Sequence, residues 1–297
     1  MKNSELKALI TLLDDPNFTV YESVEKRLKE IGPAIVPELK DAWEHSEDEL
    51  FLERTSAIIS NVLFEDIYNK FKKWIKEDSD NLQYAVFLIA KYNFPDITYQ
   101  SFSEQIDDLK NDVNLQMNDN LSSLEKIWVL NHIFYTNYKF RRSTNDFYSP
   151  KNSYINRVLE TKQGNTVSLA IIYLLVANKL ALPVYGVNLP KNFILAYTDE
   201  APGNEIEQGS ENSDVSFYIN PYNNGAILTK SEIEKFLKQQ KIVSLDIYFN
   251  PCNNKVIIQR LLENLVYSYQ KLHDSEKVND LKKIIELFER SLQKTNS

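Results

Sequence analysis

Cysteine, glycine, proline and histidine are all scarce in this sequence of 297 residues. The single cysteine, Cys252, allows no disulfide within the chain, and nothing in the cysteine usage points to an oxidising compartment. The 6 glycines and 10 prolines, set beside many Leu, Lys and Glu, favour a largely helical fold. No Cys or His pair has the spacing of metal ligands, and the scattered glycines form no phosphate-binding motif. We therefore expect no metal and no cofactor.

Clustered positive charge and long apolar runs are also missing. The formal net charge of −8 argues against broad nucleic-acid binding, which needs a basic surface. The most apolar run, Val167 to Leu182, is too short and too interrupted to cross a bilayer, and the first residues do not resemble a signal peptide. With 43% apolar residues the chain has enough for a core. We expect a soluble, cytoplasmic protein with no membrane contact.

The first part of the chain, residues 1–77, is predicted to be helical. Apolar residues recur at helical spacing after the turn signal at Asp14 to Asn17, and Gly32-Pro33 ends that helix. The pattern "LLDDPNFTVYESVEKRLKEIGPAIVPELKDAW" resembles one HEAT-type helical hairpin. An ordinary helical bundle fits the same pattern, and both alternatives stay open.

Residues 81–140 continue as helices. The segment "SSLEKIWVLNHIFYTNYKF" begins with a capping box, in which Glu125 fits only the register with Ser122 as the cap. His132 follows among aromatic residues, where a packed core histidine is more common than a catalytic base. We therefore expect His132 in the core.

After Pro183 the pattern changes to β-branched and aromatic residues. The segments "PVYGVNLP", "NFILAYTD" and "VSFYINPY" predict three strands. The stretch from Asp199 to Asp214 holds six acidic and no basic residues, which is typical of a solvated loop. Thr229, with Glu232 three residues later, is predicted to cap a further helix. The tail then forms two helices with a turn near His273 to Ser275, which resemble a TPR-like hairpin.

The segment "QGNTVSLAIIYLLVANKLALP" places a polar corner before a buried helix. A residue at such a helix start meets unpaired backbone N–H groups and the positive end of the helix dipole. A cysteine there becomes a thiolate nucleophile, a His on a following strand acts as base, and an Asp or Asn on the next strand orients that His. Transglutaminase-like and papain-like enzymes use this layout.

A family resemblance covers roughly residues 80 to 290. Its most telling pieces are "NSYINRVLETKQGN", "YGVNLPKNF" and "INPYNNG". These segments resemble the SirB family of transglutaminase-like proteins, often described as regulators of SirC expression with transglutaminase-like and TPR domains. The resemblance implies a mainly helical α+β fold. It implies a helix packed on an antiparallel sheet, which we assign to residues 78–250. The HEAT-like helices at 1–77 precede this domain, and the TPR-like hairpin at 251–297 follows it.

The same resemblance assigns the catalytic positions of the family to residues that depart from its pattern. The nucleophile position falls at Thr166, the base position at Asn192 and the orienting acid at Asn220. Asparagine cannot act as a base near neutral pH, and a hydroxyl without a base is a weak nucleophile. We expect Thr166 to cap the helix in a vacated active site. The candidates that line the cleft are Gly164, Asn165, Ser168, Phe193 and Tyr222.

The sequence thus predicts a protein without transglutaminase catalysis, which binds protein partners as a scaffold or regulator. The alternative is a hydrolase or acyl transferase that uses Thr166 or an unrecognised nucleophile in the same cleft. A relocated pair of Cys252 and His132 is a further possibility, although Cys252 stands in the wrong chain order and has no His near it in sequence.

Overall fold

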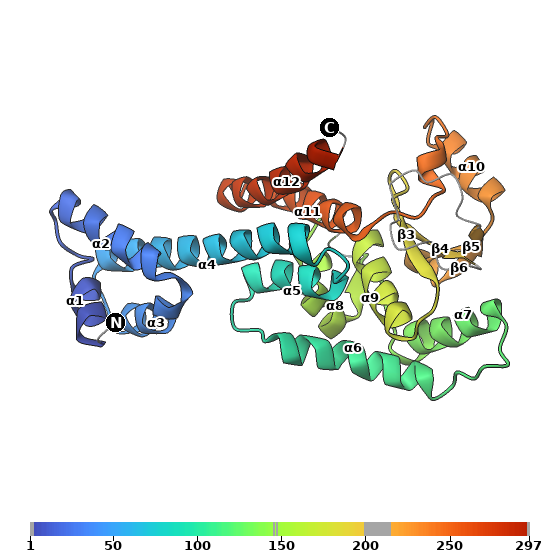
Figure 1. Ribbon diagram of the computed structural model, residues 1–297, viewed down its shortest axis with the longest axis horizontal. Helices are drawn as coiled ribbons and strands as arrows, with labels where there is room; N and C mark the ends of the chain where they lie inside the picture. The colour runs from blue at the N-terminus through green and yellow to red at the C-terminus, as the bar shows by residue number, and fades with distance from the viewer. Residues whose placement is uncertain (1–2, 145, 147, 199–214, 296–297) are drawn as a thin grey trace. The chain divides into compact units, whose positions relative to one another are not determined.

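Helices make up most of the molecule, and one small antiparallel sheet lies among them (Figure 1). The computed structural model describes residues 3–144, 146, 148–198 and 215–295. The predicted acidic loop, Asp199 to Asp214, lies outside the described residues. The contacts divide the chain into two compact units, Met1–Lys73 and Trp74–Ser297.

The helices of the first unit are α1 (Asn3–Thr11), α2 (Phe18–Ile31), η1 (Gly32–Ile35), α3 (Val36–Glu44) and the first part of α4 (Glu49–Glu77). As predicted, α2 ends at Gly32, whose φ of +78° suits glycine and whose N–H bonds to the carbonyls of Leu28 and Lys29. Arg54 on α4 donates to the carbonyls of Leu13 and Asp15, at 2.7 and 2.9 Å. The unit is helical, and its HEAT-like character stays a prediction.

The helices of the second unit surround its sheet and a central helix. They are α5 (Leu82–Asn93), α6 (Tyr99–Asn114), α7 (Ser123–Asn131), η2 (His132–Asn137), η3 (Pro150–Asn152), α8 (Ile155–Thr161), α9 (Thr166–Lys179), η4 (Pro221–Asn223), α10 (Lys230–Gln239), η5 (Asp246–Tyr248), α11 (Asn254–Lys271) and α12 (Ser275–Thr295). The capping boxes predicted at Ser122 and Thr229 are both present. In each, the side chain of the glutamate three residues later, Glu125 or Glu232, accepts the backbone N–H of the capping residue.

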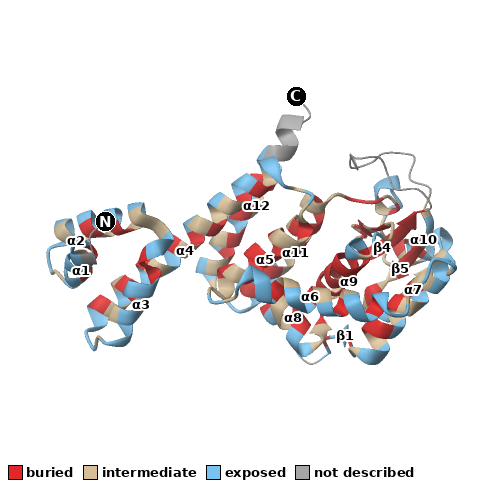
Figure 2. Ribbon diagram, turned by 60° about the horizontal axis from the view of Figure 1, so that its bottom comes forward, coloured by how far each residue is buried: buried red, intermediate tan, exposed pale blue. Residues whose placement is uncertain are grey.

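Helix α9 is the centre of the second unit. Every residue from 167 to 177 is buried, which Figure 2 shows as red on α9. The helix contacts α6, α8 and α11, and it also contacts β3 (Val184–Val187) and β4 (Ile194–Thr198) of the sheet. A helix that is apolar all round has to be covered on all sides, and these neighbours supply the cover.

The sheet has the order β3-β4-β5-β6, with every neighbouring pair antiparallel. The three predicted strands are β3, β4 and β5 (Val215–Asn220), whereas β6 (Ala226–Leu228) was not predicted. Side chains alternate along a strand, so Ile194 and Ala196 face α10 in one cluster with Ile233 and Leu237, and the next residues face α9. The sheet therefore lies between α9 and α10.

The last two helices, α11 and α12, pack on each other as a helical hairpin. Their connection contains His273, with φ of +58°, at the turn that the sequence predicts. Helix α11 also contacts α5 and α9, so the hairpin covers the core of the second unit. Its TPR-like character stays a prediction. Within the described residues, no helix combines the length and the apolar content that crossing a membrane requires.

Candidate functional site

The start of α9 is held by an asparagine cap. Asn165 has extended backbone, and its Oδ1 accepts hydrogen bonds from the N–H groups of Val167 and Ser168, at 3.0 and 2.9 Å. Ser168 Oγ accepts the N–H of Asn165 in return, at 2.9 Å, which completes a capping box. The predicted cap at Thr166 is wrong, because the asparagine side chain one residue earlier already reaches these donors. Thr166 is the first helical residue, and within the described chain its hydroxyl makes no hydrogen bond.

Further polar contacts lock this cap to the segment before α8. Asn165 Nδ2 donates to Ser153 Oγ at 2.8 Å, and Ser168 Oγ donates to the carbonyl of Asn152 at 2.6 Å. Ser153 is 1% exposed and Ser168 is 0% exposed. We call Asn152, Ser153, Asn165 and Ser168 the helix-start network. Two N–H groups of the first turn donate to the Asn165 side chain of this network. They therefore do not point toward a reacting group, as the donors of an oxyanion hole must.

A short parallel strand pair fixes the residues that precede the cap. β1 (Arg141–Arg142) pairs with β2 (Gln163–Gly164), and the N–H of Arg141 donates to the carbonyl of Lys162 at 2.8 Å. A Cβ atom on Gly164 would lie 2.6 Å from Ser168 Oγ and 3.0 Å from Val158. Only glycine therefore allows β2 to approach the first turn of α9 this closely. Gly164 is buried and makes room for the helix-start network.

Asn192 and Asn220 lie at the same end of the sheet, because Asn192 precedes β4 and Asn220 ends the antiparallel β5. Asn192 Oδ1 accepts the N–H of Phe193 at 2.9 Å, and Asn220 Oδ1 accepts the N–H of Tyr222 at 3.2 Å. Both asparagines are half-buried. Each amide oxygen thus serves its own turn, and among the described residues no hydrogen bond joins either asparagine to Thr166.

The remaining candidates for lining a cleft have different surroundings. Phe193 is 0% exposed, and its ring fills the space beside Gly186, where a Cβ would lie 2.9 Å from the ring. Tyr222 is half-buried in η4. Gly164 and Ser168 are buried in the contacts described above, and Asn165 is half-buried.

A second polar network, which sequence reasoning missed, holds the turn after β5. Asn131 Nδ2 donates to the carbonyl of Gly225 at 3.0 Å, and Asn131 Oδ1 accepts the hydroxyl of Tyr173 on α9 at 2.9 Å. Tyr135 donates to the carbonyl of Pro221 at 2.9 Å. Burial raises the pKa of the Tyr173 hydroxyl, which keeps it a donor. Gly225, with φ of +69°, is the sequence signal for a special turn, but its partner Asn131 carries none.

His132 and Cys252 lie in different surroundings, one exposed and the other buried. His132 is exposed beside Trp128, which corrects its expected place in the core. It is the first residue of the π-helical η2, where the spacing of side chains around the helix changes. Cys252 is buried, and its N–H donates to the carbonyl of Gly186 at 2.7 Å. Burial raises the pKa of its thiol to about 12, so it is not a thiolate near neutral pH. Within the described residues, no group of three His, Cys, Asp or Glu side chains is placed to hold a metal.

Comparisons with known proteins match the same region of the chain. The model of the transglutaminase-like superfamily matches residues 100–263. F-box only protein 21 of Mus musculus is 30% identical over 155 residues, which are 49% of this chain and 23% of that protein. A UPF0162 protein of Xylella fastidiosa (strain 9a5c) is 22% identical over 197 residues, 64% of this chain and 66% of that protein. The UPF0162 protein YchA of Escherichia coli (strain K12) is 30% identical over 156 residues, 52% of each chain. No solved structure matches.

Proposed function

The chain belongs to the transglutaminase-like superfamily, and we propose that it lacks acyl-transfer catalysis and acts instead by binding other proteins. The proposal depends on the three positions at which the family pattern expects a nucleophile, a base and an acid. Thr166, Asn192 and Asn220 carry no group that titrates near neutral pH. Loss of the base alone typically lowers the rate by about 10²–10⁴-fold.

The surroundings of these positions support the same proposal. The amide oxygens of Asn192 and Asn220 are occupied by backbone N–H groups, so neither asparagine is held ready to orient a base. The cap formed by Asn165 occupies two backbone donors beside Thr166. A nucleophilic hydroxyl needs a base within hydrogen-bond reach. Within the described residues, Thr166 has none.

Protein binding is proposed from the helical segments that flank the central domain. We propose HEAT-like helices at 1–77, the transglutaminase-like domain at 78–250 and a TPR-like hairpin at 251–297, with the role of a scaffold or regulator that the SirB resemblance implies.

Helix α7 of the central domain also exposes apolar side chains. Leu124 and Trp128 are 39% and 59% exposed, and their spacing of four residues places them on one face. An exposed tryptophan of this kind is a common anchor of protein interfaces.

Acyl-transfer assays test the catalytic half of the proposal. The purified protein is incubated with a glutamine-containing peptide and a fluorescent primary amine, and separately with aryl ester and anilide probes. We expect rates equal to those of buffer alone, and equal rates for Thr166→Ala. Turnover that Thr166→Ala abolishes would overturn the proposal and establish the hydrolase or acyl transferase alternative.

The triple change Thr166→Cys, Asn192→His and Asn220→Asp tests whether these positions correspond to the family triad. Aspartate keeps the acceptor that binds the N–H of Tyr222, so we expect a folded protein with an unchanged circular dichroism spectrum. An aggregated product would count against the assignment of the three positions.

Capture of partners from the native cell tests the binding half. The intact protein and Trp128→Ala are immobilised in parallel. We expect a protein partner whose recovery falls in the variant, and the absence of any specific partner would count against a scaffold role.

A further inference from the structure

The surface around β1 carries positive charge that the fold itself does not use. Lys139, Arg141 and Arg142 are exposed, and the two arginines form β1. Within the described residues, no ion pair or side-chain hydrogen bond engages any of the three. We call these three residues the basic strip. On a chain with a formal net charge of −8, it is a local exception that is open to a carboxylate from outside.

Buried neighbours hold the backbone of the basic strip in place. Phe140 is 1% exposed and stacks on Phe134, with ring centroids 4.2 Å apart. After the strip, the N–H of the buried Ser143 donates to the carbonyl of Gly164 at 3.0 Å. Lys162 is half-buried over the Phe140 ring, 5.0 Å from its centroid, so it supports the strip and is not counted in it. The strip is therefore preformed, which lowers the cost of ordering it on binding.

The carboxylates near the basic strip do not neutralise it. From residue 139 to residue 162 the chain has six cations and two carboxylates, Asp146 and Glu160. Glu160 pairs with Arg157, and Asp112 on the neighbouring α6 accepts a tyrosine hydroxyl at 2.7 Å. Within the part of the chain that the structure describes, none of these carboxylates forms an ion pair with the strip. The positive charge of the strip is thus left for a partner.

The basic strip lies near two of the positions at which the family pattern expects catalytic groups. Arg142 pairs with Gly164, which stands two residues before Thr166. β1 also contacts η4, which directly follows Asn220. A segment that crosses β1 therefore lies beside the start of α9 and the end of β5.

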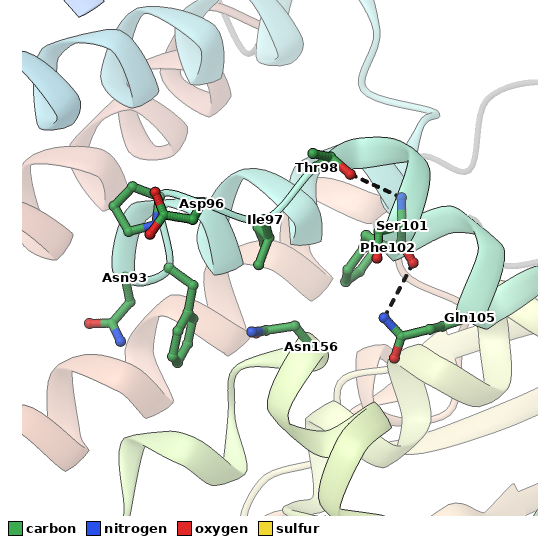
Figure 3. Close-up of a pocket in the computed structure, with 10 residues that line it drawn as sticks. Asn93, Asp96, Ile97, Thr98, Ser101, Phe102, Gln105 and Asn156 are labelled. Atoms are coloured by element: carbon green, nitrogen blue, oxygen red, sulfur yellow. Dashed lines mark hydrogen bonds between the residues drawn. The ribbon is translucent and has the colours of Figure 1, made fainter. Parts of the chain in front are cut away.

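A cavity of about 600 Å³ between the loop that joins α5 to α6 and helix α8 is a second candidate for docking (Figure 3). Figure 3 shows Ile97, Phe102 and the amide of Asn156 around it. Asp96 is the charged residue among those that line it. An anionic segment would be repelled there and is attracted to the basic strip, so the charges separate the two surfaces.

We propose that the basic strip docks an extended, acidic segment of a partner protein. This inference rests on the proposed binding function and names the chemistry of the partner. A guanidinium binds a carboxylate through two parallel hydrogen bonds, so Arg141 and Arg142 each take one carboxylate. Side chains alternate along both β1 and an extended segment, which lets neighbouring acidic residues meet both arginines. A long nucleic acid suits the site less, because its phosphates would also meet the negative charge of the rest of the chain.

Fluorescence anisotropy measures the binding of labelled peptides to the full chain. One peptide consists of repeated Glu-Gly-Ser units, and its counterpart has Gln at each Glu position. We expect the Glu peptide to bind at least about fivefold more tightly at low salt, since several exposed charge pairs each contribute a modest amount. The preference should vanish in about 1 M salt, where the Debye length is about 3 Å. Equal affinity of the two peptides at low salt would overturn the proposal.

A double change at the strip locates the binding. Arg141→Glu with Arg142→Glu should weaken the Glu peptide by about tenfold or more, because two attractive pairs become repulsive. Lys235→Glu with Lys238→Glu changes the net charge equally at two exposed lysines of α10 and is the matched control. Ile97→Trp, which fills the cavity, is a second control. Unchanged affinity in the strip variant, or an equal loss in either control, would place the peptide elsewhere and overturn the proposal.

Further outcomes separate this inference from the function on which it rests. A native partner that the strip variant captures as well as the intact protein does would overturn the acidic segment and leave protein binding standing. An intact protein that captures no partner would count against the binding function itself. A single-stranded RNA that binds more tightly than the Glu peptide would overturn the proposal in favour of nucleic acid. If the double Glu variant fails to fold, Arg141→Gln with Arg142→Gln decides, because it removes the charge alone.

Discussion

Asn165 and Asn156 are the same kind of side chain in two opposite situations. Asn165 uses its oxygen for two backbone N–H groups and its nitrogen for Ser153. Asn156, on the next helix back along the chain, has a buried oxygen with no partner. The first arrangement stabilises the folded chain, whereas the second costs free energy, because the oxygen has lost its water and has gained no donor. Pairing, rather than burial or residue type, therefore decides what each amide contributes to the stability of the fold.

The strongest test of the structural side is Asn165→Ala. It removes the cap of α9 and leaves Ser153 Oγ without its donor, so we expect the free energy of unfolding to fall by about 2–4 kcal/mol. Urea denaturation followed by circular dichroism measures the change. Asn114→Ala on the exposed surface is the control and should shift stability by less than about 0.5 kcal/mol. A loss below about 1 kcal/mol for Asn165→Ala would mean that the cap does not hold the helix start.

The next largest effect is expected for Ser168→Ala. The hydroxyl donates to the carbonyl of Asn152 and accepts the N–H of Asn165, and its removal leaves these two groups to their longer mutual hydrogen bond of 3.3 Å. We expect a loss of about 1–3 kcal/mol in the same urea experiment. Ser168→Cys keeps a weak donor at similar size and should lose less. If alanine and cysteine cost the same, volume rather than hydrogen bonding would explain the effect.

Local signals in the sequence predicted much of this fold. The apolar run of α9, the three strands and the capping boxes at Ser122 and Thr229 each depend on neighbours within a few residues. The cap of α9 was misplaced by one residue, because asparagine and threonine both cap helices and stand side by side here. Choosing between them required the contact from Asn165 to Ser153, which local pattern does not contain.

Contacts between distant residues were beyond sequence reasoning. Asn131 and Gly225 are separated by 94 residues, and no pattern on α7 marks Asn131 as the partner of that turn. The cavity beside Asn156 likewise depends on how the loop after α5 is held against α8. The exposed His132 was expected in the core because aromatic neighbours in sequence do not reveal the change from α7 to the π-helical η2. Tertiary packing decides each of these.

A smaller effect is expected for a change at Tyr269 on α11. Tyr269 donates to Asn93 and shares a hydrogen bond of 2.9 Å with the hydroxyl of Tyr154. Tyr269→Phe removes both, and we expect a loss of about 1 kcal/mol of stability, because the half-buried Asn93 oxygen loses its donor. Tyr267→Phe, an exposed tyrosine on the same helix, is the control.

The smallest effect is expected for Thr166→Ala, although Thr166 directly follows Asn165, where the largest effect is expected. The Thr166 hydroxyl makes no hydrogen bond within the described residues, and the donors that it was expected to cap already bond to Asn165. Alanine also favours helix more than threonine does, so the two small terms oppose each other. We expect a change in unfolding free energy within about 0.5 kcal/mol. A loss comparable to that of Asn165→Ala would show that Thr166 shares the cap, and the distinction between a paired asparagine and an unpaired hydroxyl would then fail at this helix start.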